Sequence, residues 1–291
     1  MTKFKLNLLF PLICLTLSLL FPAACMQGVK NGLSLSLYGA LPSLFPSLVL
    51  SAILTKQKGF CPKKPYLIPF FLGLFCGFPV GAASVSALVR EGTLSRKDGE
   101  KLLFFCNNAG PAFLISYCGG SILQDPRKGL FLYLLQCAIS SFCLFLSFGK
   151  HLFHKDAAAE SKEGFHGSAA SVFPSALRDG MNSFLYIMSC IIFFSFLSEL
   201  ISSLLSLRSF PRAVLGIFLE LCGGLKLLQK IPSPLAFPLC ALACGWGGLS
   251  VHLQTAGILQ ESKIGIKYHL PGKIFFAAAL FSLTLFLQKL L

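Results

Sequence analysis

The stretch FCNNAGP places two side-chain amides beside a Gly-Pro pair in the middle of an apolar run. In a helix, Pro111 cannot donate a hydrogen bond to the carbonyl of Asn107, and Gly110 removes the steric barrier to unwinding. The break would leave free carbonyls, two amides and a new helix N-terminus, which membrane proteins tolerate only when they are buried or line a cavity. Asn107 and Asn108 are therefore predicted to contact a ligand, an ion or the other half of the protein. Simple hydrogen bonding between helices is the alternative.

A second polar break is predicted in residues 244–254, CGWGGLSVHLQ, where three glycines fall within four residues. If the helix resumes after them, Ser250 and Gln254 are four residues apart and share one face, while His252 lies on the other side. His252 fits two interpretations equally well: a packed neutral histidine or a proton-coupling group.

Glu220, in FLELCGGL, is the most informative carboxylate, because a charge within a membrane segment costs about 3 kcal/mol or more. It is predicted to bind a cation or a proton, or to hydrogen-bond a substrate. A structural ion pair with Lys226 is the alternative. The segment around Glu220 is short and is predicted to break at Gly223 and Gly224.

These residues must be positioned by segments that are long enough to cross a membrane. Of the 291 residues, 55% are hydrophobic and only 12% are charged, about half the charged fraction of soluble domains. We therefore predict an all-α polytopic membrane protein. The formal charge of +14 is explained by basic residues that flank membrane segments, so no nucleic acid partner is expected. The apolar segments are 6–26, 35–54, 67–89, 102–123, 130–149, 184–206, 213–229, 234–259 and 274–288.

The basic loops indicate which segments cross. Loops 55–66 and 90–101 each carry four Lys or Arg residues, yet a crossing at 67–89 would place them on opposite sides of the membrane. We therefore predict that 67–89 is a re-entrant hairpin that turns at GFPVGA, residues 77–82. We predict a second re-entrant hairpin at 213–229. About seven full crossings then remain.

The order crossing, hairpin, crossing, crossing occurs twice and in opposite orientation, a plan typical of secondary transporters with midplane sites. We divide the chain into an N-terminal helix and connector (1–34), a first repeat (35–149), a cytoplasmic linker (150–183) and an inverted second repeat (184–291). The predicted substrate site joins both hairpin tips and both broken helices: Gly77, Phe78, Pro79, Gly81, Asn107, Asn108, Gly110, Pro111, Glu220, Gly247, Gly248, Ser250, His252 and Gln254.

Enzyme signatures such as a P-loop, a nucleotide-binding glycine motif or a catalytic triad spacing are not found, so no enzymatic activity is expected. The 12 cysteines form no CxxC pair and no Cys/His metal spacing, and we expect no metal and no cofactor beyond a coupling H+ or Na+. A metal site among the histidines of the loop near 150–171 is a weak alternative. The first apolar segment is expected to be an uncleaved helix.

FCNNAGP and GGLSVHLQ, together with GFPVGA and the early segment FPAACMQGVKNGLSLSLYGALPSLFPSLVLS, resemble YlbJ-type sporulation integral membrane proteins with a nucleoside-recognition, or Gate, domain. The likeness spans roughly residues 20 to 290. It implies a plan similar to concentrative nucleoside transporters, a multi-pass bacterial protein of the outer forespore membrane, and movement of dipicolinic acid. One departure is Cys222, where the family pattern often has a hydroxyl residue.

Helix N-termini and amides suit a planar dianion such as dipicolinate. Our leading hypothesis is thus a secondary transporter or facilitator of a small planar anion. A nucleoside or nucleobase carrier and a non-transporting protein of spore-envelope assembly are the alternatives. The expected partners are the small anion and the lipid bilayer, and a homo-oligomer stays open.

Overall fold

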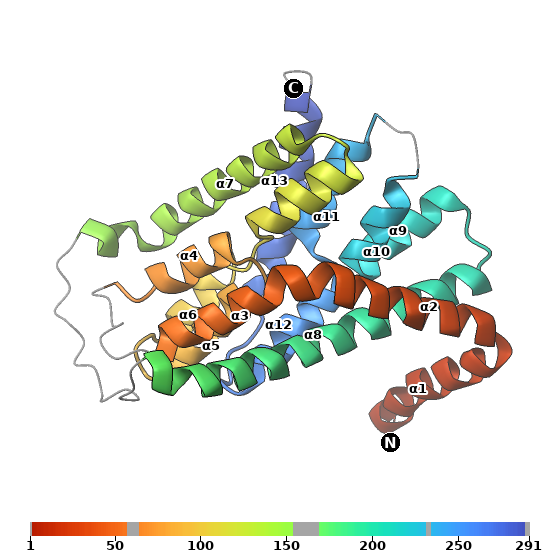
Figure 1. Ribbon diagram of the computed structural model, residues 1–291, viewed down its shortest axis with the longest axis horizontal. Helices are drawn as coiled ribbons and strands as arrows, with labels where there is room; N and C mark the ends of the chain where they lie inside the picture. The colour runs from red at the N-terminus through yellow and green to blue at the C-terminus, as the bar shows by residue number, and fades with distance from the viewer. Residues whose placement is uncertain (1, 57–63, 154–168, 231–233, 289–291) are drawn as a thin grey trace.

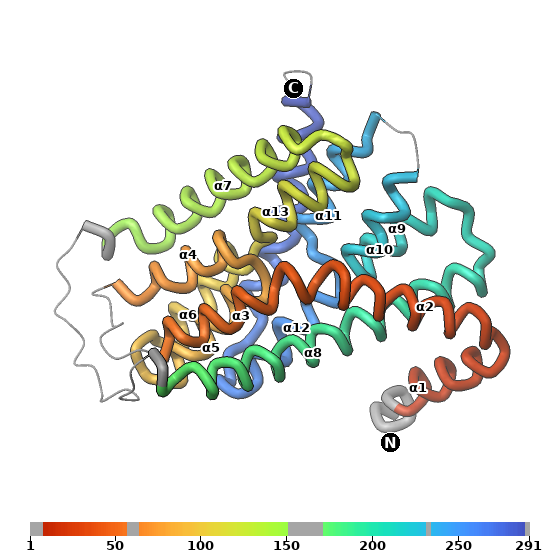
Figure 2. The backbone as a smooth tube through the Cα atoms, viewed as in Figure 1, coloured from red at the N-terminus to blue at the C-terminus, as the bar shows by residue number. Residues whose placement is uncertain are grey.

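The computed structural model describes residues 2–56, 64–153, 169–230 and 234–288 (Figure 2). Their regular structure is entirely helical, without strands. Five helices of this part are long and apolar enough to cross a membrane, and they are Pro22–Lys56, Pro126–Lys150, Ser171–Leu204, Ala236–Gln260 and His269–Leu287. Large apolar side chains are exposed along them, as at Phe142 and Leu146. The predicted class, an all-α multi-pass integral membrane protein, is confirmed.

A helix at the N-terminus, α1 (Thr2–Leu20), precedes two runs of elements with the same order: a long helix, a helical hairpin, a broken helix and a final helix. The first run comprises α2 (Pro22–Leu35) continuing through the π-helical η1 (Ser36–Ala40) into α3 (Leu41–Lys56), then α4 (Leu67–Phe75) and α5 (Val80–Arg90), then α6 (Arg96–Leu102) and the π-helical η2 (Ala112–Ile122), and finally α7 (Pro126–Phe153). The second run comprises α8 (Ala169–Leu204), α9 (Ser209–Leu219) and α10 (Leu221–Leu228), α11 (Ala236–Trp246) and α12 (Gly248–Gln260), and α13 (His269–Leu287).

The first long helices of the two runs pack side by side in opposite directions (Figure 1). Glycines allow the close contact, because a Cβ on Gly28 would lie 2.7 Å from the Cα of Phe196 and one on Gly32 would lie 2.6 Å from the Cα of Ile192. Residue numbers rise on one helix as they fall on the other, so the pair is antiparallel. The hairpins α4–α5 and α9–α10 accordingly enter from opposite ends of the molecule, and their tips point toward its centre (Figure 1).

Both ends of the α4–α5 hairpin lie at the same end of the molecule. Tyr66, just before α4, stacks on Phe148 with ring centroids 4.8 Å apart, and Lys101 Nζ lies 5.9 Å from the centroid of the same ring. The end of α5 is joined to the end of α12 by the ion pair of Arg90 with Glu261. The described residues that flank 67–89 therefore lie at one end of the molecule, an arrangement that the re-entrant prediction requires.

Several predicted boundaries were wrong. The chain stays helical between 26 and 35, where two segments were predicted, and α8 begins at Ala169, so the predicted linker 150–183 is partly helix. The predicted crossing at 102–123 is a turn-rich stretch followed by the 11-residue η2. Asp179 lies within α8 and pairs with Lys56 of α3. Because such charged residues were assigned to the linker, the predicted start of this helix was too late. The side chains of His151, His154 and His166 lie outside the described part.

Candidate functional site

A cavity of about 460 Å³ lies between the two hairpin tips and the two broken helices, and η1, α3 and α8 complete its wall. Phe78 and Glu220 line it from the tips, and Gly110 and Gln254 line it from the broken helices. Its volume falls within the range of small-molecule sites, and its wall is mostly apolar with few polar groups. Residues of both runs of elements form this wall, which we call the central cavity.

The first tip is held against the broken segment 103–111. The backbone N–H of Phe78 donates to the carbonyl of Asn108 over 2.6 Å. Gly77 has a φ of 83°, and a Cβ there would lie 2.6 Å from the nitrogen of Gly110, so the close approach requires glycine. The predicted break after Asn107–Pro111 is confirmed, since η2 begins at Ala112.

The second tip breaks at Glu220, which is extended, and not at Gly223 and Gly224 as predicted. Its carboxylate caps α10 by accepting hydrogen bonds from the N–H groups of Cys222 at 3.2 Å and Gly223 at 2.6 Å. Gly224 lies inside α10 and packs against Gly216 of α9, because a Cβ on Gly216 would lie 2.7 Å from the Cα of Gly224. The glycines therefore serve helix contact, and the carboxylate makes the turn.

The tip of the second hairpin is tied to the first run of elements by Tyr117 of η2. Its hydroxyl donates to the carbonyl of Cys222 over 2.9 Å, and its ring stacks on Phe113 with centroids 5.2 Å apart. Both rings line the central cavity. Sequence analysis did not select Phe113 or Tyr117, although they lie on the first turns after the break at Pro111.

The break between α11 and α12 falls at Gly247, as predicted. Gly247 and Gly248 have φ values of 85° and 79°, a conformation that side chains other than glycine rarely adopt. The predicted shared face of Ser250 and Gln254 is also found, because Gln254 Nε2 donates to Ser250 Oγ over 3.0 Å. His252 lies on the other side, where its Nδ1 is 3.1 Å from Nε2 of His269.

The two asparagines are buried and make different contacts. Asn107 Nδ2 donates to Thr255 Oγ1 of α12 over 2.9 Å, so it reaches the other half of the protein. Asn108 Nδ2 donates to the carbonyl of Phe105 at 2.7 Å and to Ser140 Oγ of α7 at 2.8 Å. These bonds brace the broken segment. Neither asparagine lines the central cavity.

Of the predicted site residues, Phe78, Gly110, Glu220 and Gln254 line the central cavity. The other ten do not line it, and they are Gly77, Pro79, Gly81, Asn107, Asn108, Pro111, Gly247, Gly248, Ser250 and His252.

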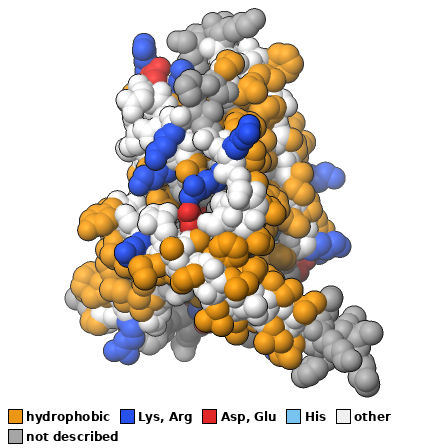
Figure 3. All heavy atoms as spheres, turned by 90° about the vertical axis from the view of Figure 1, so that its right-hand side faces the viewer, with side chains coloured by type: hydrophobic (Ala, Val, Ile, Leu, Met, Phe, Trp, Pro, Cys, Tyr) orange, Lys and Arg blue, Asp and Glu red, His pale blue; other side chains and the backbone are white. Residues whose placement is uncertain are grey.

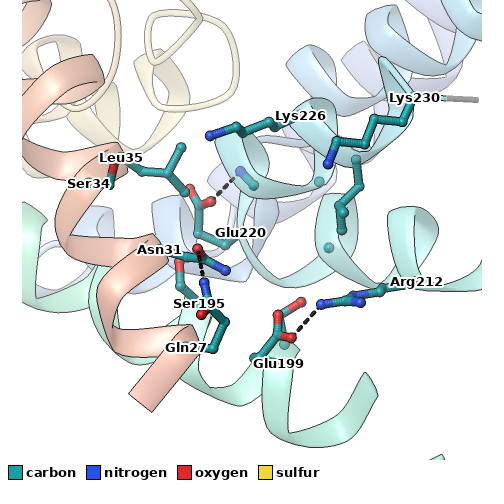
Figure 4. A pocket seen from close by; sticks show the side chains of 15 residues that line it. Gln27, Asn31, Ser34, Leu35, Ser195, Glu199, Arg212, Glu220, Lys226 and Lys230 are labelled. Carbon is teal, nitrogen blue, oxygen red and sulfur yellow. Dashed lines mark hydrogen bonds and ion pairs between the residues drawn. The ribbon is translucent and has the colours of Figure 1, made fainter. Parts of the chain in front are cut away.

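A second cavity of about 330 Å³ opens beside Glu220 (Figure 4), and we call it the vestibule. Arg212, Lys226 and Lys230 line it together with Glu199, which pairs with Arg212. In the view of Figure 3, onto the right-hand end of Figure 1, Lys and Arg side chains surround a hollow with acidic oxygens in it. Among the described residues no ion pair joins Lys226 to Glu220, whose carboxylate caps α10 instead.

The vestibule and the central cavity share two lining residues, Leu35 and Glu220. A Cβ on Gly223 would lie 3.1 Å from Glu220 Oε2 and 3.5 Å from Leu35 Cδ1, so these two side chains are close neighbours at this point. One apolar and one acidic side chain therefore line both cavities.

Three buried thiols also come together away from both cavities. The sulfur atoms of Cys118, Cys240 and Cys244 all lie within 4.8 Å of one another, and those of Cys118 and Cys244 are 3.5 Å apart. Sequence spacing could not show this group, because Cys118 belongs to η2 and the other two belong to α11.

The chain has a relative among known proteins. The chain is similar to the sporulation integral membrane protein YlbJ of Bacillus subtilis (strain 168), with 25% identity over 303 residues, which cover 84% of this chain and 73% of that protein. The predicted resemblance to YlbJ-type membrane proteins is confirmed. No family model and no solved structure matches the chain.

Proposed function

We propose that this integral membrane protein is a secondary transporter or facilitator of a small planar anion, dipicolinate first. The observation that carries the proposal is the central cavity, which residues of both hairpin tips and both broken helices line and which shares Leu35 and Glu220 with a basic vestibule. Discontinuous helices that meet between antiparallel repeats are the usual setting of a transported substrate.

The vestibule favours an anion. Arg212, Lys226 and Lys230 outnumber the two carboxylates that share its wall, Glu199 and Glu220. Positive charge at the mouth of a cleft raises the local concentration of anions and speeds their arrival.

The central cavity suits a planar ring. Phe113 and Tyr117 present stacked aromatic faces on its wall, and Gln254 adds an amide. Alternating access would move one run of elements against the other around this point. In one state, movement of Leu35 and Glu220, which line both cavities, would open the central cavity toward the vestibule.

Glu220 supplies the site for a coupling cation. An anion that passes a buried carboxylate is repelled unless the carboxylate is neutralised by a proton or a sodium ion. The position of Glu220 between both cavities makes it the residue where cation and anion would travel together.

The relative is a sporulation protein of Bacillus subtilis. We extend this role to the present chain, in the outer forespore membrane, with flux directed toward the forespore. Spore dipicolinate content in a strain that lacks the relative and expresses this chain tests the extension.

The decisive experiment is dipicolinate flux into proteoliposomes that contain the full chain, with a Ser116→Trp variant to fill the central cavity. Ser116 lines that cavity, whereas Ser189 is exposed on α8 outside it, so Ser189→Trp is the matched control. Saturable flux in the wild type and in Ser189→Trp, with loss in Ser116→Trp, supports the proposal. Absence of flux in folded wild-type protein under H+ and Na+ gradients contradicts it and favours a role in envelope assembly.

A nucleoside or nucleobase carrier is the second candidate. It is favoured by Glu220 and Gln254, which offer hydrogen-bonding groups on an otherwise largely apolar wall. Nucleoside flux that dipicolinate does not inhibit would select this candidate over the first.

A further inference from the structure

Lys273 is a buried cation in the membrane-spanning part whose Nζ makes no hydrogen bond. It lies in the second turn of α13, is 2% exposed, and its Nζ has no hydrogen-bond partner. Sequence analysis placed it in a loop, because the predicted span began at residue 274. An unpaired lysine inside a membrane protein is costly, and nearness to a helix N-terminus adds to the cost. Such a residue is a functional candidate by default.

Among the described residues no carboxylate makes a hydrogen bond with Lys273 Nζ. His252 Nε2 is a second buried atom without a hydrogen-bond partner. His252 of α12 is joined to α13 through His269, since its Nδ1 lies 3.1 Å from Nε2 of His269, which precedes Lys273 by one helical turn. Two buried nitrogen atoms without hydrogen-bond partners therefore lie on adjoining parts of α12 and α13.

The ring of Phe78 links Lys273 to the central cavity. Lys273 Nζ lies 5.5 Å from the centroid of this ring, and Phe78 lines the cavity. A cation–π contact compensates a buried ammonium only in part. The central cavity itself is lined by no Lys or Arg among the described residues, so Lys273 is the cation next to its wall.

We infer that Lys273 and His252 form a carboxylate-binding subsite behind Phe78, which one carboxylate of the transported anion occupies once the ring of Phe78 moves aside. This inference rests on the proposed transport of a planar anion. It names the residues that would bind the negative charge of that anion. A carboxylate can accept from the ammonium and from a protonated imidazole nitrogen, which would satisfy the Nζ and Nε2 atoms that now lack partners.

The subsite also gives the two hairpin tips complementary roles. At the second tip, Glu220 stands between the cavity and a basic vestibule, and at the first tip Phe78 stands between the cavity and Lys273. An anion would thus meet basic groups on both sides of a largely apolar chamber, with one movable side chain at each boundary.

The test is ligand-induced thermal stabilisation of the purified full chain in detergent. The probes are dipicolinate, picolinate, which lacks one carboxylate, and the neutral pyridine-2,6-dimethanol. The variants are Lys273→Met and Lys273→Arg. Lys267→Met is the matched control, because Lys267 also makes a cation–π contact, with Tyr268, but is exposed.

We expect dipicolinate to stabilise the wild type and Lys267→Met, and to bind at least tenfold more weakly to Lys273→Met. In that variant the preference for dipicolinate over picolinate should vanish, and Lys273→Arg should restore part of it. Without ligand, Lys273→Met should unfold at the wild-type temperature or above, because an uncompensated charge is removed.

Wild-type affinity in Lys273→Met would overturn the subsite and leave the proposed function standing, as would a loss of affinity in Lys267→Met of the same size. Lysine-dependent stabilisation by other carboxylates but not by dipicolinate would support the subsite and refute the proposed substrate. If no carboxylate stabilises the wild type, the subsite is overturned. Transport is tested independently by the flux measurement in proteoliposomes. If Lys273→Met does not fold, Lys273→Gln replaces it in the same comparison.

Discussion

Substitution of Glu220 separates its two roles, the cap of α10 and the carrier of a coupling charge. The carboxylate accepts two N–H bonds at the start of α10, from Cys222 at 3.2 Å and Gly223 at 2.6 Å. Loss of an N-cap side chain costs about 0.5–2 kcal/mol. Because Glu220 is 3% exposed and its bonds are charge-assisted, we expect Glu220→Ala to lie near the upper limit, about 2 kcal/mol.

Glu220→Gln keeps an acceptor oxygen for the same N–H groups, so its cost should stay below about 1 kcal/mol. The free energy of unfolding can be measured in mixed micelles with increasing SDS, and dipicolinate flux can be measured with and without an imposed H+ or Na+ gradient. We expect Glu220→Gln to fold nearly as the wild type does while flux no longer responds to the gradient.

Glu199→Gln is the control, since Glu199 lines the same vestibule but pairs with Arg212. The pair is partly buried, with the Glu199 side chain 16% exposed, so its loss should cost about 1–3 kcal/mol while coupling survives. Equal destabilisation by Glu220→Ala and Glu220→Gln would refute the capping argument. A wild-type gradient response in Glu220→Gln would refute the coupling argument.

Two further predictions follow from the broken segment and the hairpins. Asn108→Ala should lower the free energy of unfolding by about 2–4 kcal/mol, because it removes both Nδ2 bonds and leaves a buried carbonyl unsatisfied. Ser140→Ala, which removes one of these bonds, should cost about 1 kcal/mol. If chemical unfolding shows an equally small effect for both variants, the brace is dispensable. In a cysteine-free background, single cysteines that replace Lys64 and Lys97 should react with an impermeant maleimide from the same side of the membrane. A cysteine that replaces Ser209 should react from the opposite side. Labelling of positions 64 and 97 from different sides would refute the re-entrant α4–α5 hairpin.

The local breaks could be predicted because their causes are local. Pro111 cannot continue a helix, and consecutive glycines such as Gly247 and Gly248 allow backbone that other residues avoid. The four-residue spacing of Ser250 and Gln254 likewise fixed a shared face that the hydrogen bond between them confirms. The turn at Glu220 was placed wrongly, since a carboxylate that caps the next helix leaves no mark in spacing as strong as a glycine pair.

Helix lengths were predicted less well, because tertiary contacts extend helices past the apolar runs. Asp179 and Arg178 looked like loop residues, yet α8 includes them, and Asp179 meets Lys56 across the interface with α3. Lys273 was counted with a cytoplasmic loop for the same reason. The number of charged residues in a segment indicates the free-energy cost of exposing that segment to lipid. It does not show which residues of the folded protein those charges contact.

The sequence by itself determined that this protein is a helical membrane protein, where its helices break, and that a hairpin and a broken helix recur in each half. These features follow from hydropathy, proline and glycine, and each acts over a few residues. Only the tertiary structure decided which polar residues share a space. It placed Asn108 against Ser140 as a brace, Glu220 between two cavities, and Lys273 behind Phe78. At each of these places, residues far apart in the chain come together because the two halves pack antiparallel. No local sequence pattern encodes contacts between such distant residues.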